Sequence, residues 1–132
     1  GIRVTMTTAH HSAGDWNPGG ETTLYLGDPN GFVVELENGF RFYFAGDTDV
    51  FSDMKLIGEL YQPQIGFLPI GDLYTMGPKQ AAKASELLGI KQIVPMHYGT
   101  FPALTGTPAK LRELVAPRGV EVLELKPGET AS

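Results

Sequence analysis

Apolar and polar residues alternate along the first third of the chain in a way that predicts strands. Residues 2–8 place Ile2, Val4 and Met6 at every second position, the pattern of a half-buried strand. Residues 23–27 indicate another short strand. The apolar runs at 32–37 and 40–45 are separated only by Asn38-Gly39. This pair predicts a hairpin with a type I′ turn, because both residues tolerate positive φ.

Beyond residue 45, helical periodicity alternates with apolar strand patterns. We predict a helix capped by Ser52 with Met54, Ile57, Leu60 and Tyr61 on its apolar face. A second helix should run from Pro78 to Gly89. A third should start at Thr107-Pro108 with Leu111, Leu114 and Val115 inward. Strands are expected at 64–70, 91–96 and 120–125. The order predicts an α/β fold in which a meander of strands precedes a βαβαβαβ run.

Three polar residues follow three of these strands. Asp47, Asp72 and His97 stand at equal steps of 25 residues, a step that suits one strand plus one helix. In sheets with such connections, ligands bind outside the carboxyl ends of the strands. The histidine pair His10-His11 directly follows the first strand. We therefore expect metal-competent groups on one rim of the sheet.

Each of these signals has a plain structural alternative. A Gly-Asp-Thr after a strand is, taken alone, more often a turn or a helix cap than a ligand. His11 alone could be a core or surface histidine, and Asp72 could simply cap the turn before the second helix. The coincidence is stronger than its parts, because imidazole and carboxylate together suit zinc, manganese or iron.

Composition narrows the function classes. A net charge of −5 gives no sign of nucleic-acid binding. The absence of cysteine excludes disulfides and thiolate zinc sites. No run approaches the length of a membrane span and no signal peptide is visible, so we expect a cytoplasmic protein without membrane contacts. A length of 132 residues fits one domain at most.

Four stretches carry a resemblance to a known family: AHHSAG, YFAGDTDVFSDMKLIGE, IGFLPIGDLYTMGPKQAAKA and IVPMHYGTFP. They look like the metallo-β-lactamase superfamily, and more narrowly its uncharacterised metal-dependent hydrolase branch, related to the ascorbate-6-phosphate lactonases. The resemblance runs from about Val4 to Gly128. It implies an αββα sandwich, a mixed sheet with packed helices, with the site at one edge between two similar halves.

The resemblance also implies roles for individual residues. Asp47 corresponds to the aspartate that bridges two metals, His11 to the last histidine of the first metal site, and His97 to the histidine of the second. We prefer His11 to His10 because Ser12 follows it, as in the family's His-Ser pattern. Asp47 and His97 would be the catalytic residues, with zinc or manganese as the two ions. Asp72, Thr75 and His10 are candidates for contacts with substrate or with the ligands, and Trp16 and Tyr74 could line a pocket or simply pack.

One departure from the family is informative. The superfamily signature His-x-His-x-Asp-His, which lies upstream of the His11 motif in the family, is absent. The chain therefore resembles the C-terminal half of the enzyme, a single incomplete domain. Three ligands split over two metals cannot close two sites. The complete protein should hydrolyse an ester, lactone or phosphoester of a small molecule with a metal-bound hydroxide, while this chain alone should be inactive. The alternative is a non-catalytic fragment or binding module, and either would need a missing half, a separate chain or a second copy.

Overall fold

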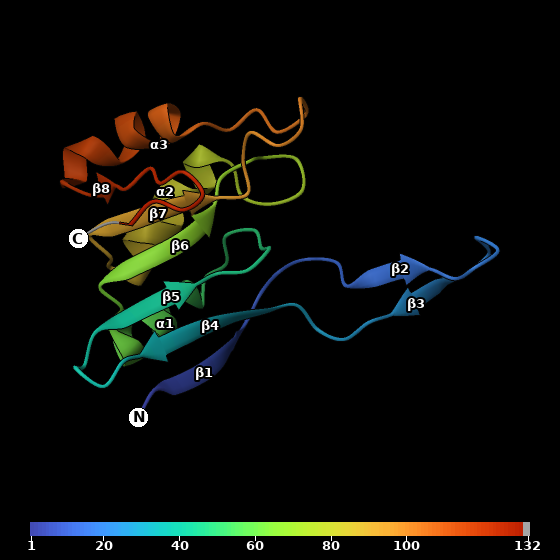
Figure 1. Ribbon diagram of the computed structural model, residues 1–132, viewed down its shortest axis with the longest axis horizontal. Coiled ribbons are helices and arrows are strands. Elements are labelled where there is room, and N and C mark those ends of the chain that lie inside the picture. Colours follow the sequence, from blue (N-terminus) through green and yellow to red (C-terminus); the bar gives the residue numbers. More distant parts are fainter. Residues whose placement is uncertain (131–132) are drawn as a thin grey trace.

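A six-stranded mixed sheet organises the computed structural model, which describes residues 1–130 (Figure 1). Its strand order is β1-β4-β5-β6-β7-β8. The strands β1 (Arg3–Thr8), β4 (Asn30–Glu35) and β5 (Arg41–Phe44) pair antiparallel. The strands β6 (Ile65–Pro69), β7 (Gln92–Met96) and β8 (Glu121–Val122) continue in parallel from β5. The predicted succession of helices and strands after residue 40 is confirmed, although β8 is much shorter than the apolar run at 120–125. The strands before residue 40 do not form one meander, because β1 pairs directly with β4 and the two short strands between them pair with each other in a separate sheet.

Three helices connect the parallel strands: α1 (Met54–Tyr61), α2 (Pro78–Leu88) and α3 (Pro108–Val115), the last followed by the 3-10 turn η1 (Ala116–Arg118). The helix α2 begins at Pro78 and ends at a left-handed Gly89, as predicted. The prediction for α1 was wrong at its start, because Asp53 is the N-cap residue and no side chain caps the helix. Leu60 and Leu114 are 70% and 47% exposed rather than inward.

The turn between β4 and β5 differs from the predicted one. The amide of Gly39 donates to the carbonyl of Leu36, and the amide of Leu36 donates to the carbonyl of Phe40. Gly39 has φ +81°, whereas Asn38 is not among the residues with positive φ. The connection is therefore a three-residue loop whose last residue, Gly39, is left-handed, a common hairpin type, and not a type I′ turn.

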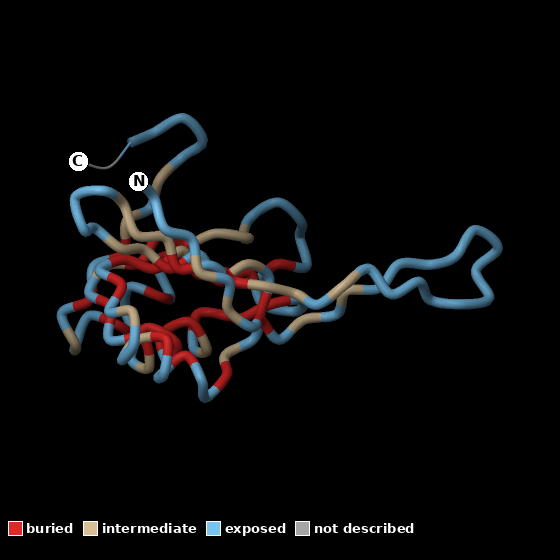
Figure 2. Tube along the Cα trace, turned by 90° about the horizontal axis from the view of Figure 1, so that it is seen from below, coloured by how far each residue is buried: buried red, intermediate tan, exposed pale blue. Residues whose placement is uncertain are grey.

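The loop expected at 12–22 contains part of a second hairpin. The strands β2 (Gly14–Trp16) and β3 (Thr23–Tyr25) pair antiparallel and every residue in them is exposed. Figures 1 and 2 show this hairpin projecting from the body of the protein. We call residues 12–27 the arm. It leaves the body directly after His11.

The two faces of the sheet differ in how far they are covered. Tyr43, Leu68 and Ile93 are fully buried on the face against which the helices pack. On the other face of β1, β4 and β5, the apolar side chains of Val4, Met6, Phe32 and Phe44 are 38–66% exposed. We call this surface the open face. The side chains of the open face alternate along each strand with those of the helix-covered face, so the predicted alternation is confirmed. In β1, however, the apolar side of the strand faces solvent.

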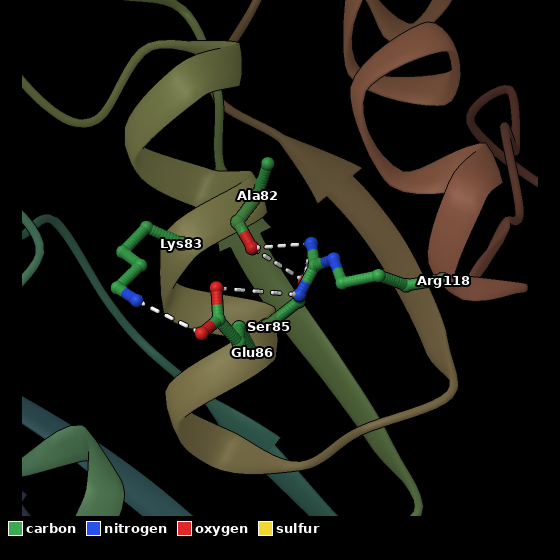
Figure 3. A network of polar contacts seen from close by, with 5 residues as sticks. All are labelled: Ala82, Lys83, Ser85, Glu86 and Arg118. Atoms are coloured by element: carbon green, nitrogen blue, oxygen red, sulfur yellow. Dashed lines mark hydrogen bonds and ion pairs between the residues drawn. The ribbon is translucent and has the colours of Figure 1, made fainter.

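A polar network fastens the C-terminal helical segment to α2 (Figure 3). The guanidinium of Arg118 donates to the carbonyl of Ala82 at 2.6 Å and to the hydroxyl of Ser85 at 3.1 Å. Glu86 lies 4.0 Å from Arg118 and 2.9 Å from Lys83. Ala82 lies within α2, and its carbonyl also accepts the buried hydroxyl of Ser85 at 2.8 Å, so Arg118 adds a donor to a polar group inside the helix. The network holds η1 in place at the side of the fold.

Candidate metal centre

The carboxyl ends of β5, β6 and β7 carry Asp47, Asp72 and His97 in turn, as the 25-residue spacing predicts. The strands β5 and β7 are separated by β6, a distance of about 10 Å between their backbones. The side chains nevertheless meet, with His97 Nε2 lying 3.8 Å from Asp47 Oδ2. They converge over the end of β6, where Gly71 has no side chain to stand between them.

The backbone of His97 is unusual. Its φ of +55° is left-handed, a conformation that non-glycine residues rarely adopt and that occurs preferentially at functional sites. Nδ1 of its ring is buried and has no hydrogen-bond partner among the described residues. Nε2 is therefore the nitrogen that faces Asp47 and remains available to a ligand. Burial, and to a smaller extent the Glu124 carboxylate, raises the pKa of the neighbouring Tyr98, so its phenol stays neutral at physiological pH.

Asp72 turns toward its own loop. Its Oδ1 accepts the amide of Leu73 at 2.9 Å, and its carboxylate lies against Gly77, the N-cap residue of α2. Both Asp72 and Leu73 are left-handed, with φ of +69° and +63°. These contacts agree with a turn-forming role. In the same loop, the buried hydroxyl of Thr75 has no partner, while Tyr74 is 62% exposed.

The two histidines of the pair have different surroundings. His10 is anchored through its backbone, and its ring stacks on Phe51 with centroids 4.7 Å apart. The ring of His11 is partly buried, and its Nδ1 lies 2.7 Å from the carbonyl of Ser12. Both line a cavity of about 570 Å³ at the root of the arm, together with Asp28 and Asn30. The ring of His10 is thus engaged in a stacking contact, while the choice between the two histidines as a ligand stays a prediction.

The described residues bring two of the predicted ligands together but not three. Among residues 1–130, no group of three or more histidine, aspartate or glutamate side chains is arranged to hold a metal ion. Trp16 is 69% exposed on the arm. A second cavity of about 770 Å³, lined by Gly58, Gln62 and Gly89, lies at the opposite ends of β6 and β7, away from the candidate chemistry.

Sequence reasoning did not single out Thr48, which the structure places among these loops. It is fully buried, although it follows an exposed Asp47. Its hydroxyl accepts the amide of His10 at 2.8 Å. The sequence signal that could have pointed to Thr48 is its position after the aspartate in Gly46-Asp47-Thr48, a motif interpreted above as a turn or a helix cap.

Comparison with known proteins agrees with this fold. Residues 1–98 match the family model of the beta-lactamase superfamily domain. The chain therefore belongs to the metallo-β-lactamase superfamily.

Individual relatives narrow the similarity. The chain is 51% identical over 131 residues to a UPF0173 metal-dependent hydrolase of Rubrobacter xylanophilus, covering 98% of this chain and 54% of the relative. A similarly named protein of Koribacter versatilis is 53% identical over 131 residues, covering 99% and 54%. The chain thus spans about half the length of the curated relatives it matches.

Solved structures show the same partial coverage. Igni18, a metallo hydrolase from the archaeon Ignicoccus hospitalis, matches 99% of this chain and 52% of its own, with a TM-score of 0.84 and 38% identity. An isothiocyanate hydrolase from Delia radicum gut bacteria matches 100% and 54%, with a TM-score of 0.74 and 26% identity. Among residues 1–130, no helix has the length and apolar character that crossing a membrane requires.

Proposed function

We propose that this chain supplies Asp47, His97 and His11 to the centre of a metal-dependent hydrolase that acts on a small-molecule ester, lactone or phosphoester. The observation that carries the proposal is the approach of His97 Nε2 to Asp47 Oδ2 at 3.8 Å, from strands that are not neighbours. The naming of the relatives as metal-dependent hydrolases supports the same activity.

The distance fits a shared ion better than a hydrogen bond. At 3.8 Å the two atoms are too far apart to hydrogen-bond. Two donors that each lie about 2.1 Å from one zinc ion are separated by at most about 4.2 Å. Asp47 and His97 fit that limit, and an imidazole with a carboxylate suits zinc or manganese. Since no third donor joins them among residues 1–130, the complete centre of two ions needs ligands beyond this group.

A divalent ion in such a centre lowers the pKa of bound water to about 7, so that hydroxide is available at neutral pH. The residues of this chain would hold the metal and orient the ligand atoms around it. Asp47 projects from the loop after β5 and is half exposed, open toward the rim. His97 is more buried and presents Nε2 in a fixed direction, because its backbone turns sharply at the end of β7.

The open face bears on how the domain is completed. Monomers rarely expose contiguous apolar patches beyond a few hundred Å², yet Val4, Met6 and Phe44 lie together on this face. We propose that the chain corresponds to the C-terminal half of the superfamily's αββα sandwich, in the branch related to the ascorbate-6-phosphate lactonases. A second sheet, which carries the remaining ligands, would cover the open face.

The alternative is a non-catalytic fragment or binding module that requires a separate N-terminal chain. Both proposals require a partner that covers the open face, so the open face does not distinguish between them. The two proposals differ in whether the rim holds metal and turns over substrate. If the hydrolase proposal is correct, elemental mass spectrometry of the purified full-length protein should detect bound divalent metal.

The activity test is a hydrolysis screen of the full-length protein with added zinc or manganese. Model substrates should include a nitrophenyl ester, a lactone, a phosphodiester and, because of the relative named above, an isothiocyanate. We expect turnover of at least one that Asp47→Asn reduces by orders of magnitude. Metal-free protein that neither binds zinc or manganese nor turns over any substrate would contradict the enzyme and favour the binding module.

A further inference from the structure

We propose that Thr48 is a positioning residue, which fixes the segment carrying the histidine pair against the segment carrying Asp47. This inference rests on the proposed function only for its catalytic consequence. The contacts themselves are independent of it. Thr48 is fully buried at the rim, although both of its sequence neighbours are exposed carboxylates.

The hydroxyl of Thr48 is used in both directions. Oγ1 accepts the amide of His10 at 2.8 Å and donates to the carbonyl of Asp49 at 2.7 Å. The amide of Asp49 in turn donates to the carbonyl of His10 at 3.0 Å. The segment at 10 is therefore joined to the segment at 48–49 by two bonds over 38 residues of chain. A single side-chain oxygen that both accepts and donates has to be a hydroxyl.

The backbone of Thr48 makes a third connection. Its carbonyl accepts the amide of Met76 at 3.0 Å, and the carbonyl of Met76 accepts the amide of Asp72 at 3.0 Å. The loop after β6 is thereby tied to the loop after β5. Thr48 therefore bonds the segment that carries the histidine pair and the loop that carries Asp72 and Thr75. It lies next to Asp47 in the chain.

The consequence for the site follows from how ligands are held. Loss of a hydrogen bond made directly to a metal ligand typically weakens metal binding about 10- to 100-fold. Thr48 acts one step further out, through the backbone of His10 and Asp49, so the lower end of that range is expected. The carboxylate of Asp47 is about half exposed and lies 3.8 Å from His97 Nε2, beyond hydrogen-bond distance, so its own contacts restrain it only weakly. The buried hydroxyl of Thr48, next to Asp47 in the chain, supplies this restraint. The same hydroxyl anchors the amide of His10, one residue before His11.

Three variants of the full-length protein test the inference. Thr48→Val keeps the shape of the side chain and removes the hydroxyl. Thr48→Ser keeps the hydroxyl and removes a methyl group. Ser85→Ala is the matched control, since it removes a buried hydroxyl that also accepts and donates, on α2 and outside the rim.

The measurements are zinc affinity by competition with a chelator, the visible spectrum of the cobalt-substituted protein, and hydrogen exchange of the His10 amide without metal. Thr48→Val should bind zinc about 10-fold more weakly, alter the cobalt spectrum and speed exchange at His10. Thr48→Ser should restore all three to near the original values. Ser85→Ala should lower the melting temperature without changing affinity or spectrum.

Two results would overturn the inference. Zinc affinity and His10 exchange unchanged in Thr48→Val would show that the hydroxyl positions nothing. Equal loss of affinity in Thr48→Val and Ser85→Ala would show that general destabilisation is the cause. If the unaltered protein binds no divalent metal, the proposed function fails instead, while His10 exchange in the two Thr48 variants still decides the positioning role.

Discussion

A Cβ atom added to Gly71 would lie 2.1 Å from the carbonyl oxygen of His97 and 3.4 Å from its Nδ1. No real Cβ tolerates the first of these distances. The end of β6 therefore has to lack a side chain for the backbone of β7 to turn at His97. This relationship allows the imidazole at the end of β7 to approach Asp47, which follows β5.

Replacing Gly71 with alanine should displace His97 and separate it from Asp47. The added methyl group meets backbone, which cannot yield as a side chain can. We expect a loss of stability of about 1–3 kcal/mol, typical of overpacking, together with weaker metal binding. Urea unfolding and metal titration of the full-length protein measure the two effects.

Gly66→Ala on the same strand is the control. Its Cβ would lie 2.6 Å from the terminal methyl group of Ile90 and 3.6 Å from the Leu68 side chain, so it meets side chains, which yield more easily than backbone. This variant should lose less stability and keep its metal affinity. Unchanged metal binding in Gly71→Ala would show that the close approach does not position His97.

The candidate ligands make a second prediction. In the complete enzyme Asp47→Ala should abolish binding of divalent metal, because the carboxylate is proposed to bridge both ions. His11→Ala should lower metal content strongly. His10→Ala should cost mainly stability, since its ring stacks on the buried Phe51.

Metal content and melting temperature, measured together, separate the two histidines. Equal metal losses in His10→Ala and His11→Ala would undo the choice of His11. Retention of both ions without Asp47 would contradict the bridging role.

The hairpin turn gives a third prediction. Gly39 has φ +81°, so Gly39→Val should destabilise the fold by more than about 1 kcal/mol through backbone strain. Asn38→Ala should cost only the bond between its side chain and the amide of Phe40, 3.0 Å long, which is worth about 0.5–1.5 kcal/mol. Urea unfolding compares them, and a neutral Gly39→Val would mean that the turn is wrongly described.

Tyr43 makes stability depend on high pH. Burial raises its pKa to about 12, against a smaller lowering by the nearby Thr7 hydroxyl, which does not reach hydrogen-bond geometry. The unfolded chain loses this proton near pH 10, whereas the folded protein keeps it. Stability contributed by the neutral phenol is therefore complete below pH 10 and falls as the pH rises to 12, by about 2–3 kcal/mol.

Tyr43→Phe should remove this part of the pH dependence. Because the hydroxyl is buried without a partner, the variant should be about as stable as the original protein at pH 7. Urea unfolding at several pH values between 9 and 12 provides the comparison. Identical slopes in both proteins would contradict the assignment.

The open face predicts self-association of the isolated 132-residue chain. Exposed Met6 and Phe44 should drive dimers or larger species, visible by size exclusion with light scattering. Met6→Lys with Phe44→Lys should shift the chain toward monomer, while Leu114→Lys, an exposed residue on α3, should not. A monomer that turned over substrate without these changes would show that no further half is needed.

Much of the fold could be predicted from local sequence, because its signals are short-range. Pro78 and Gly89 bound α2 at both ends, and each acts on its own helix terminus. The spacing of Asp47 and His97 also sufficed, since parallel strands with helical connections bring their carboxyl ends to one rim. These features do not depend on what packs around them.

The errors fall where tertiary surroundings decide. Leu60 continues the apolar periodicity of α1, yet nothing covers the last turn of that helix on the side where it points. Ser52 has the chemistry of a cap, but the helix begins after Asp53. The role of Thr48 depends on contacts with His10 and Met76, which are far away in sequence, so no local pattern could reveal it.

The left-handed backbone at His97 also limits which residues can replace the histidine at this position. Asparagine and aspartate enter this conformation more readily than other residues, while branched side chains are strongly disfavoured. Exchange of the donor proposed at this position is thus restricted to a few oxygen ligands, and a new metal preference would have to arise at other positions. The backbone at the end of β7 leaves little freedom to replace the imidazole.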